Sequence, residues 1–384
     1  MPNFPFPEKG AEEADRAGGL FLLKSLGHEL CVIAKYPPSE KHIDLLYKHA
    51  ENLQIELLLL PHWKKPLWKR LNPLWLDGAA YEFHDPAFLD AIENKIQNWG
   101  PKILWVDNTF LWPVARLAKQ NNIPVILRSL NIEPLHLLQE SGKSLLNFIR
   151  ATSKLLGEII AVRTADIVYA ITPNEARILR RFTSNPVCVL PLRALPSLLG
   201  KSNAPTNHSP LRVVFMGSTY NVQHNLRAAK MVIEQIAPLA EREAPGEFVF
   251  SITGGKLPTT LNKACGKNIH YEGYVDDLNI FLSNIDIAIA PSLFGAGMQQ
   301  KVFEPIARGI PTITSSRALA GYPFIDKKEV LLANTPEEFV DALLSLRSVS
   351  IRKALTDQAI KMASTNFSEE QIINTINKGL HHVL

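Results

Sequence analysis

The chain alternates short apolar runs with helical patterns, and it does so in both of its halves. Such alternation is typical of parallel sheets, because neighbouring parallel strands are joined by crossover helices. The runs predict strands in the first half at Glu29–Ala34, Ile55–Leu60, Ile103–Val106, Val125–Arg128, Ile167–Ile171 and Val187–Pro191. In the second half they predict Arg212–Met216, Phe248–Thr253, Ile285–Ala290, Thr312–Thr314 and Val330–Leu332. Helices are expected between them, including Thr109–Asn121, Asn174–Phe182, Asn225–Glu243, Gln299–Arg308 and Pro336–Leu346.

The two halves are separated by a segment without hydrophobic periodicity. Residues 194–210 are rich in Pro, Ser and Asn, which is typical of an interdomain linker. We therefore expect two Rossmann-like, doubly wound α/β domains facing a central cleft, with ligands bound beyond the carboxyl ends of the strands. The expected division is a first domain at 1–195, a linker at 196–210, a second domain at 211–365, and a C-terminal helix at 366–384 that packs back towards the first domain.

The composition excludes several classes of protein. With 46% apolar and 20% charged residues, the chain is globular rather than disordered. A net charge of +4 is far below that of a dedicated nucleic-acid binder, so no nucleic-acid partner is expected. Three cysteines without metal-ligand spacing favour a reducing cytoplasm.

The strongest candidate site follows the predicted strand that ends near Pro291. The stretch Gly295-Ala-Gly297 can present backbone N–H groups to an anion at the start of a helix. Lys301 and Glu304 are three residues apart on that helix and share a face. The lysine could neutralise a diphosphate, and the carboxylate could accept hydroxyl hydrogen bonds. A solvated surface ion pair is the alternative interpretation of these two residues.

A second candidate loop follows the first strand of the second half. Gly217 and Ser218 lie between that strand and a predicted helix, so their amides could approach a phosphate. The alternative is an ordinary strand-to-helix turn in which Asn225 caps the helix.

Residues 295–315 resemble the donor-binding signature of glycosyltransferase family 4, the group 1 transferases. The resemblance is closest to the branch written G-x-G-x-x-x-K-hhE-hhA-x-G-x-P-hh-(T/S), where h is apolar. Two further segments resemble that branch, namely Val214–Gly217 with Asn225, and His270–Leu278. The resemblance covers roughly residues 10–375 and is looser in the first half.

The resemblance implies a GT-B fold, a nucleoside-diphosphate sugar as donor and retention at the anomeric carbon. It implies no cofactor and no required metal. If the family's residue roles apply here, Lys301 and the amides of Gly217 and Ser218 would bind the diphosphate of the donor. Glu304 would bind its ribose. The other residues expected to face the donor are Gly10, Tyr274, Val275, Gly295, Ala296, Gly297 and Met298.

Three positions depart from the family pattern, two in the first half and one in the second. Ala11, Leu130 and Ala296 stand where relatives often carry glycine, histidine and glutamate. Asn131 and Glu133 remain as candidates for acceptor contact, and Glu133 joins Lys301 and Glu304 as a catalytic candidate. Three functions are open: a transferase acting on a cell-envelope glycan or lipid-linked acceptor, a weakened partner subunit, or a nucleotide-sugar epimerase.

The segment His62–Trp75 combines tryptophans with cations. Tryptophan favours the membrane interface, and cations are attracted to anionic headgroups. We expect it to be exposed and to bind the inner face of a membrane, which suits a cytoplasmic, peripheral enzyme with a lipid-linked acceptor. A buried tryptophan cluster is the alternative. The residues concerned are Trp63, Lys64, Lys65, Trp68, Lys69, Arg70 and Trp75.

The start of the chain lacks the pattern of a first strand. Only Met1–Pro5, with two prolines, precedes the loop-like residues Phe6–Gly10. Proline cannot donate to the ladder of a central strand. We hypothesise that the chain starts late and that a natural form carries about 8–12 more residues, enough for one strand. Otherwise the first sheet should be one strand short.

Overall fold

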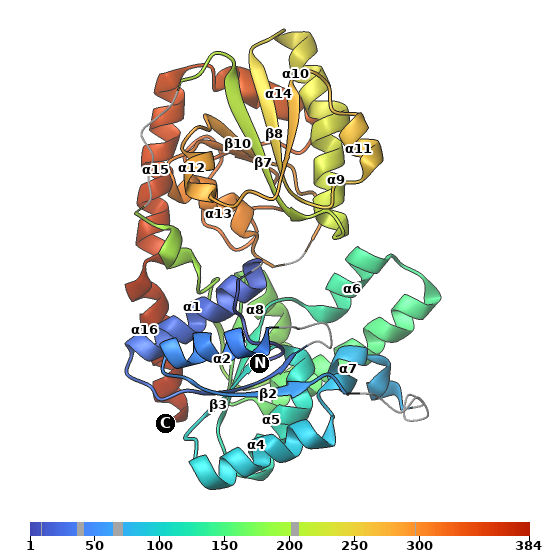
Figure 1. Cartoon of the computed structure of the whole chain (residues 1–384), viewed down its shortest axis with the longest axis vertical. Helices are drawn as coiled ribbons and strands as arrows, with labels where there is room; N and C mark the ends of the chain where they lie inside the picture. The colour runs from blue at the N-terminus through green and yellow to red at the C-terminus, as the bar shows by residue number, and fades with distance from the viewer. Residues whose placement is uncertain (9, 37–41, 64–71, 201–206, 296) are drawn as a thin grey trace. The chain divides into compact units, whose positions relative to one another are not determined.

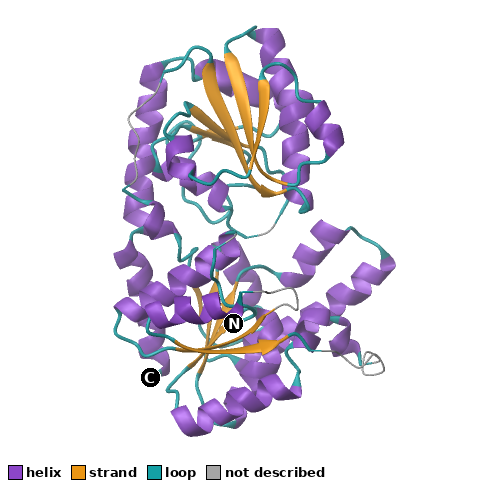
Figure 2. Cartoon of the chain, viewed as in Figure 1, coloured by secondary structure: helices purple, strands orange, loops and turns teal. Residues whose placement is uncertain are grey.

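The computed structural model consists of two compact α/β units (Figures 1 and 2). It describes residues 1–8, 10–36, 42–63, 72–200, 207–295 and 297–384. The first unit comprises residues 1–194 and 372–384, and the second comprises Leu195–Gln371. The predicted α/β class with parallel sheets is confirmed.

Within its described part, the first unit has two parallel sheets, ordered β1-β2 and β3-β4-β5-β6. The strands follow the predicted apolar runs. Their bounds are β1 (Cys31–Tyr36), β2 (Glu56–Pro61), β3 (Leu104–Asp107), β4 (Val125–Ser129), β5 (Ile167–Ala170) and β6 (Val187–Val189).

The first residues of the chain run beside β1 without forming a strand. Asn3 makes a single parallel bridge with Lys35. The amino group of Met1 donates to the Ile33 carbonyl at 2.9 Å, and the Lys35 N–H donates to the Pro2 carbonyl at 3.1 Å. In the described part of the unit, the two sheets are therefore separate.

Helices cover both faces of the β3–β6 sheet. One face packs against α4, α5 and α7, and the other against α1 and residues 372–384 of α16. The helices are α1 (Ala11–Ser25), α2 (Ile43–Asn52), α3 (Gly78–Glu82), α4 (Pro86–Trp99), α5 (Trp112–Gln120), α6 (Glu133–Ser141), α7 (Leu145–Thr164), α8 (Pro173–Leu179) and α16 (Glu369–Val383), with short 3-10 turns η2 (Pro73–Leu76) and η3 (Thr109–Leu111).

A buried ion cluster joins α1 to the β-sheet. Asp15 accepts hydrogen bonds from Arg193 at 2.7 Å and from Arg128 at 3.3 Å. Arg193 also reaches Asp107 at 3.1 Å. All four side chains are almost fully buried. Burial opposes ionisation of Asp15, but Arg193 and Arg128 outweigh it and lower its pKa to about 2.

The second unit has one parallel sheet of order β12-β11-β10-β7-β8-β9. Its strands are β7 (Leu211–Thr219), β8 (Phe248–Gly255), β9 (Ile269–Gly273), β10 (Ile287–Ala290), β11 (Thr312–Thr314) and β12 (Leu331–Leu332). The sequence analysis missed β9, because exposed His270 and Glu272 interrupt its apolar pattern at the edge of the sheet.

The helices of the second unit begin close to the predicted positions, with one exception. The predicted helix Asn225–Glu243 begins at Gln223, so Asn225 lies within its first turn and the interpretation as an N-cap was wrong. The elements are η4 (Leu195–Leu198), α9 (Gln223–Met231), the π-helix η5 (Val232–Ile236), α10 (Ala237–Glu243), α11 (Thr259–Lys263), α12 (Leu278–Leu282), α13 (Gln300–Ala307), α14 (Pro336–Ser345) and α15 (Val349–Phe367). Of the described helices, none is long and apolar enough to cross a bilayer.

Candidate functional site

The candidate site of the second unit lies where the parallel strands end. The carboxyl ends of parallel strands meet at one edge of a sheet, which is where α/β folds bind ligands. The loops after β7, β8, β9, β10 and β11 leave from this edge. The helices α9 and α13 follow β7 and β10, so they begin near the same edge.

Lys301 and Asn225 form the centre of this site. Lys301 Nζ donates to Asn225 Oδ1 at 3.0 Å. The Asn225 amide donates to the Thr219 carbonyl at 3.1 Å and to Ser218 Oγ at 3.3 Å. Burial lowers the pKa of Lys301 to about 7. This geometry joins the first turns of α9 and α13 and holds a cation at the end of β7.

The two helices begin without side-chain caps. In the described structure, neither Val222 at the start of α9 nor Gln299 at the start of α13 caps its helix with a side chain. The first amide groups of a helix need external partners and carry partial positive charge. Two uncapped helix starts beside a lysine therefore favour an anion.

Glycine is required by close backbone contacts at the end of β7. A Cβ on Gly217 would lie 2.6 Å from Tyr220 Oη and 3.0 Å from the Thr253 carbonyl. The Tyr220 hydroxyl itself donates to that carbonyl at 2.5 Å. Gly254 lies beside Gly217 with φ of 116°, a conformation that favours glycine. The end of β7 is thus packed so closely against Tyr220 and β8 that only glycine fits at Gly217.

Two arginines from other elements, Arg227 of α9 and Arg317 after β11, contact the loop before α13. Gly295 has φ of 108°, and its carbonyl accepts a hydrogen bond from Arg317. The Arg227 guanidinium lies 4.9 Å from the centre of the Phe294 ring. Gly297 has φ of 66°, Met298 is buried, and Ala296 lies outside the described residues. These arginines add positive charge beside the glycine loop.

Two buried polar atoms near this loop have no hydrogen-bond partner among the described residues. They are Ser292 Oγ and Gln299 Oε1. Buried polar groups are almost always paired, so such atoms call for an explanation, and a bound polar ligand is one.

Glu304 does not stand alone on its helix. Its carboxylate accepts a hydrogen bond from Arg308 at 2.9 Å, and both side chains are buried. Arg308 also donates to Asn279 Oδ1 at 2.7 Å. The alternative of a solvated surface pair between Lys301 and Glu304 is therefore wrong. Removal of the carboxylate would leave the charge of the buried Arg308 unpaired, so Glu304→Ala is expected to destabilise the second unit.

The remaining donor candidate of the second unit is the segment after β9. Tyr274 is 71% exposed and Val275 is half-buried. Tyr274 follows the edge strand, so its ring is free of the core and accessible to a ligand. Its contact with a nucleotide base stays a prediction.

The candidates of the first unit lie at helix starts. Gly10 precedes α1, and Glu133 begins α6. Lys154 donates to Glu133 at 3.1 Å and lies 3.3 Å from Asp77. Leu130 is buried, and Asn131 is half-buried. Glu133 thus sits in an ion network rather than as an isolated acid.

Glu158 was missed by the sequence analysis. It is almost fully buried in the middle of α7. Burial, with the charge of Glu133 adding, raises its pKa to about 8. An acid that is protonated at neutral pH can donate a proton or a hydrogen bond. The only sequence signal was a glutamate within an otherwise apolar helical stretch.

Two members of the tryptophan segment pack against aromatic neighbours. Trp75 stacks on Trp112 with ring centres 5.4 Å apart, and Trp63 lies 5.2 Å from Tyr81. Both are half-buried, so the expected exposure is wrong for these two, which belong to an aromatic cluster. Lys64, Lys65, Trp68, Lys69 and Arg70 lie outside the described residues.

Three residues of the candidate site in the second unit were not recognised from the sequence. Asn225 orients Lys301 from 76 positions away, which no local pattern reveals. Arg227 lies on α9, beyond the loop after β7, and its guanidinium is 4.9 Å from the centre of the Phe294 ring. Arg317 follows β11, so a search of every strand end would have found it.

Residues 210–348 match the family model described as "Glycosyl transferases group 1". No curated protein sequence matches the chain significantly. The match covers the whole of the β7–β11 edge.

Solved structures share the architecture of the chain. Sucrose-phosphate synthase from Thermosynechococcus elongatus superposes with a TM-score of 0.69 at 15% identity, covering 96% of this chain and 92% of that one. Anabaena HepE, in complex with UDP, gives 0.68 at 12% identity, covering 97% and 96%. TarM of S. aureus gives 0.62 at 15% identity over 77% of this chain, which spans 58% of the TarM chain.

At these identities the structural likeness establishes the fold. The chain has the GT-B fold, residues 210–348 are a group 1 glycosyl transferase domain, and together these indicate a glycosyltransferase.

Proposed function

We propose that the chain is a retaining transferase of glycosyltransferase family 4. It moves a sugar from a nucleoside-diphosphate sugar, bound by the second unit, to a cell-envelope glycan or lipid-linked acceptor. The observation that carries the proposal is Lys301, which is held by Asn225 at the uncapped starts of α9 and α13. A half-buried lysine between two helix starts fits a diphosphate better than a neutral ligand.

The chemistry follows from where charge develops. When the bond between the anomeric carbon and the diphosphate breaks, negative charge grows on the leaving phosphate. Lys301 and the amides of α9 and α13 stabilise that charge from fixed positions. The acceptor hydroxyl bonds to the anomeric carbon on the same face, and its proton passes to a phosphate oxygen. This arrangement supplies the positive charge from the chain itself and calls for no metal.

A UDP-hexose is the donor that we propose. HepE has been solved with UDP and with UDP-glucose. TarM has been solved with UDP and alpha-GlcNAc-glycerol. In this chain the ribose would lie at Glu304 and the base near Tyr274. Gly295, Gly297 and Met298 would face the sugar.

Transfer from UDP-glucose and UDP-N-acetylglucosamine to a lipid or glycan acceptor tests this function, with Glu304→Gln as the diagnostic variant. Glutamine keeps a hydrogen bond to Arg308 but loses the negative charge, so thermal unfolding of the variant is measured alongside activity. Its bonds to ribose hydroxyls lose their charge as well. We expect kcat/KM for the donor to fall roughly 10- to 100-fold. The matched control is Glu337→Gln at an exposed position of α14, which should leave kcat/KM unchanged. Absence of both transfer and donor hydrolysis by the wild type would instead favour a partner subunit.

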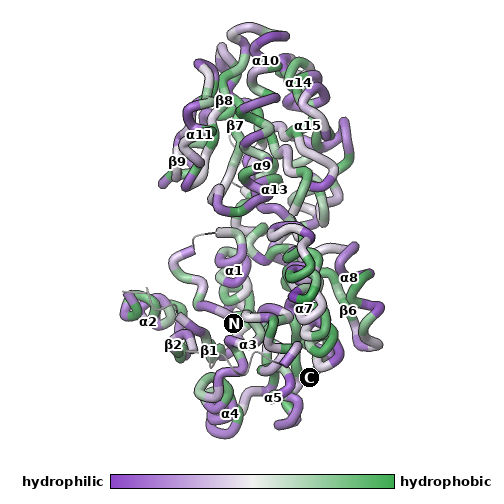
Figure 3. The backbone as a smooth tube through the Cα atoms, turned by 90° about the vertical axis from the view of Figure 1, so that its right-hand side faces the viewer, coloured by the Kyte–Doolittle hydropathy of each residue, from purple (hydrophilic) through white to green (hydrophobic). Residues whose placement is uncertain are grey.

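A membrane surface is proposed at the start of α7. Four apolar side chains are exposed there, namely Leu145 (78%), Leu146 (55%), Phe148 (48%) and Ile149 (46%). We call these residues, with the exposed cations Lys143 and Arg150, the α7 tip. Residues 141–157 contain no acidic residue, and Figure 3 colours much of α7 green, for hydrophobic residues. Apolar side chains flanked by cations suit an anionic bilayer surface.

Liposome sedimentation tests this surface, using vesicles with and without anionic lipid. The double variant Leu145→Ser with Phe148→Ser should weaken binding to anionic vesicles roughly tenfold or more, because two large apolar groups no longer enter the interface. The control Ile351→Ser removes a similarly exposed apolar side chain from α15 and should leave vesicle binding unchanged. If the double variant binds anionic vesicles as well as Ile351→Ser does, the α7 tip is not the membrane-binding surface. The membrane contact expected of Trp68 and its neighbours, which lie outside the described residues, stays a prediction.

A further inference from the structure

Glu158 is a buried acid that the proposed transfer chemistry does not use. It is 1% exposed on the buried face of α7, and neither of its carboxyl oxygens has a hydrogen-bond partner among the described residues. A buried polar group without a partner lowers stability, and a buried ionised one lowers it further. A titratable group that is kept in such a place points to a role other than folding.

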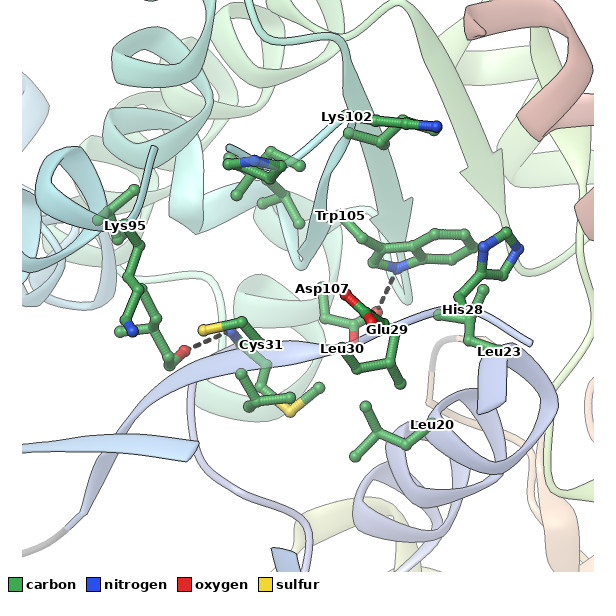
Figure 4. Close-up of a pocket in the computed structure, with 18 of the residues that line it drawn as sticks. Leu20, Leu23, His28, Glu29, Leu30, Cys31, Lys95, Lys102, Trp105 and Asp107 are labelled. Atoms are coloured by element: carbon green, nitrogen blue, oxygen red, sulfur yellow. Dashed lines mark hydrogen bonds between the residues drawn. The ribbon is translucent and has the colours of Figure 1, made fainter. Parts of the chain in front are cut away.

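The cavity of the first unit does not open onto this carboxyl. That cavity, of about 470 Å³, lies between α1, α4, β1 and β3 (Figure 4). Its described lining includes no residue of α6 or α7. The carboxyl of Glu158 is therefore enclosed by protein groups, and its protonation state depends on them.

Charged groups of three helices face Glu158. After burial, the charge of Glu133 at the start of α6 contributes most to its raised pKa, and Glu175 in the first turn of α8 adds to it. Lys154, one turn earlier on α7, acts in the opposite direction, but it already lies 3.1 Å from Glu133 and 3.3 Å from Asp77. The Glu133 N–H also favours the ionised form, without hydrogen-bond geometry to either oxygen. Because two carboxylates already oppose one lysine, an ionised Glu158 would add an unbalanced negative charge.

The helix that begins with Glu133 is held by few buried side chains. Of the residues of α6, all of which are described, Pro134 alone is buried, and the start of the helix has no side-chain cap. The helix packs on α7, as Figure 1 shows. Elements with little buried apolar surface open locally at low free energy. We therefore expect α6 to respond first when negative charge builds up against Glu133.

We propose that Glu158 is a proton-dependent switch between α6 and α7. While it holds a proton, Glu133 and the start of α6 stay docked on α7, and when it ionises, repulsion between the two carboxylates releases them. Glu133 is the acceptor candidate of the first unit, and the α7 tip begins after the turn that follows α6. A coupling of pH to acceptor or membrane binding rests on the proposed function, whereas the switch itself does not.

The pH range of the switch follows from its two states. The pKa of Glu158 is about 8 when α6 is docked and returns towards its ordinary value of 4.5 when α6 is released. The docked state therefore binds more protons between these values. Docking weakens as the pH rises from about 5 to 8 and levels off above 8. The docking equilibrium should change up to about tenfold per pH unit within this range.

Hydrogen exchange of the α6 amides tests the proposal, expressed as protection factors that correct for the intrinsic effect of pH. Protection at Leu137 and Leu138 should fall at least tenfold between about pH 5.5 and 8 in the wild type. It should stay level in Glu158→Gln, which cannot ionise. The amides of α5, which packs against α7 in the same unit, are the internal reference and should not change. The control variant is Glu51→Gln at an exposed position of α2, which should show the wild-type fall.

Two results would overturn the switch. If protection falls equally in α5 and α6, ionised Glu158 destabilises the whole unit rather than releasing one helix. If the fall in α6 persists in Glu158→Gln, another group, such as His136 on α6, is responsible. Should Glu158→Gln fail to fold, Glu158→Met removes the charge without leaving a hydrogen-bond partner unpaired, and it should give the same level profile.

Discussion

Lys301→Ala should lower kcat/KM for the donor roughly 10- to 150-fold, the effect of one lost charge-assisted hydrogen bond to a phosphate. The variant should fold, because Lys301 forms no ion pair among the described residues and its charge is opposed by burial. Steady-state kinetics at varied donor concentration measure the change. Asn225→Ala should give a smaller loss, because Asn225 positions the lysine rather than touching the donor.

The pH dependence distinguishes a phosphate-binding lysine from a structural one. Burial lowers the pKa of Lys301 to about 7, so in the free protein it becomes neutral above that pH. The donor KM should therefore rise between pH 7 and 9 in the wild type. In Lys301→Arg, whose side chain stays charged, this rise should disappear. A wild-type KM that is flat over this range would contradict the assignment.

Asp15→Asn should destabilise the first unit by about 3–5 kcal/mol, because it leaves Arg128 and Arg193 buried with insufficient negative charge. Thermal unfolding should show a fall in Tm of roughly 6–20 °C. The matched control is Asp90→Asn at an exposed position of α4. Its free energy of unfolding should stay within about 0.5 kcal/mol of the wild-type value.

The acid dependence of Asp15 has a defined sign. Its pKa is about 2 in the folded protein, below its ordinary value of 3.8. Its stabilising contribution is therefore complete above pH 4 and is lost as the pH falls through 2. The stability difference between wild type and Asp15→Asn should shrink over that window. A difference independent of pH would mean that the loss comes from packing.

The fold was predictable wherever the sequence carried a local pattern. Buried strands such as β4 and β10 are continuous apolar runs, and glycine with proline marks their ends. The edge strand β9 escaped detection, because its alternate residues face solvent.

The site was predictable in part. Lys301 and the glycine loop are close in sequence, so spacing alone indicated their chemistry. The partners of these residues are distant: Asn225 is 76 positions from Lys301, and Asp15 is 178 from Arg193. Such pairs depend on topology, which no local pattern contains. The pairing of Glu304 with Arg308 is four residues apart on one helix, so it could have been predicted from the sequence. The family resemblance instead assigned Glu304 to the donor ribose.

The central claim is that Lys301 holds the diphosphate of the donor, and titration calorimetry of UDP binding tests it most directly. At pH 8 the free Lys301 is largely neutral, and a bound diphosphate restores its charge. Binding measured in buffers of different ionisation enthalpy should therefore take up about one proton per UDP. Lys301→Ala should bind more weakly and take up none. UDP binding without proton uptake, or with uptake unchanged in Lys301→Ala, would contradict the account.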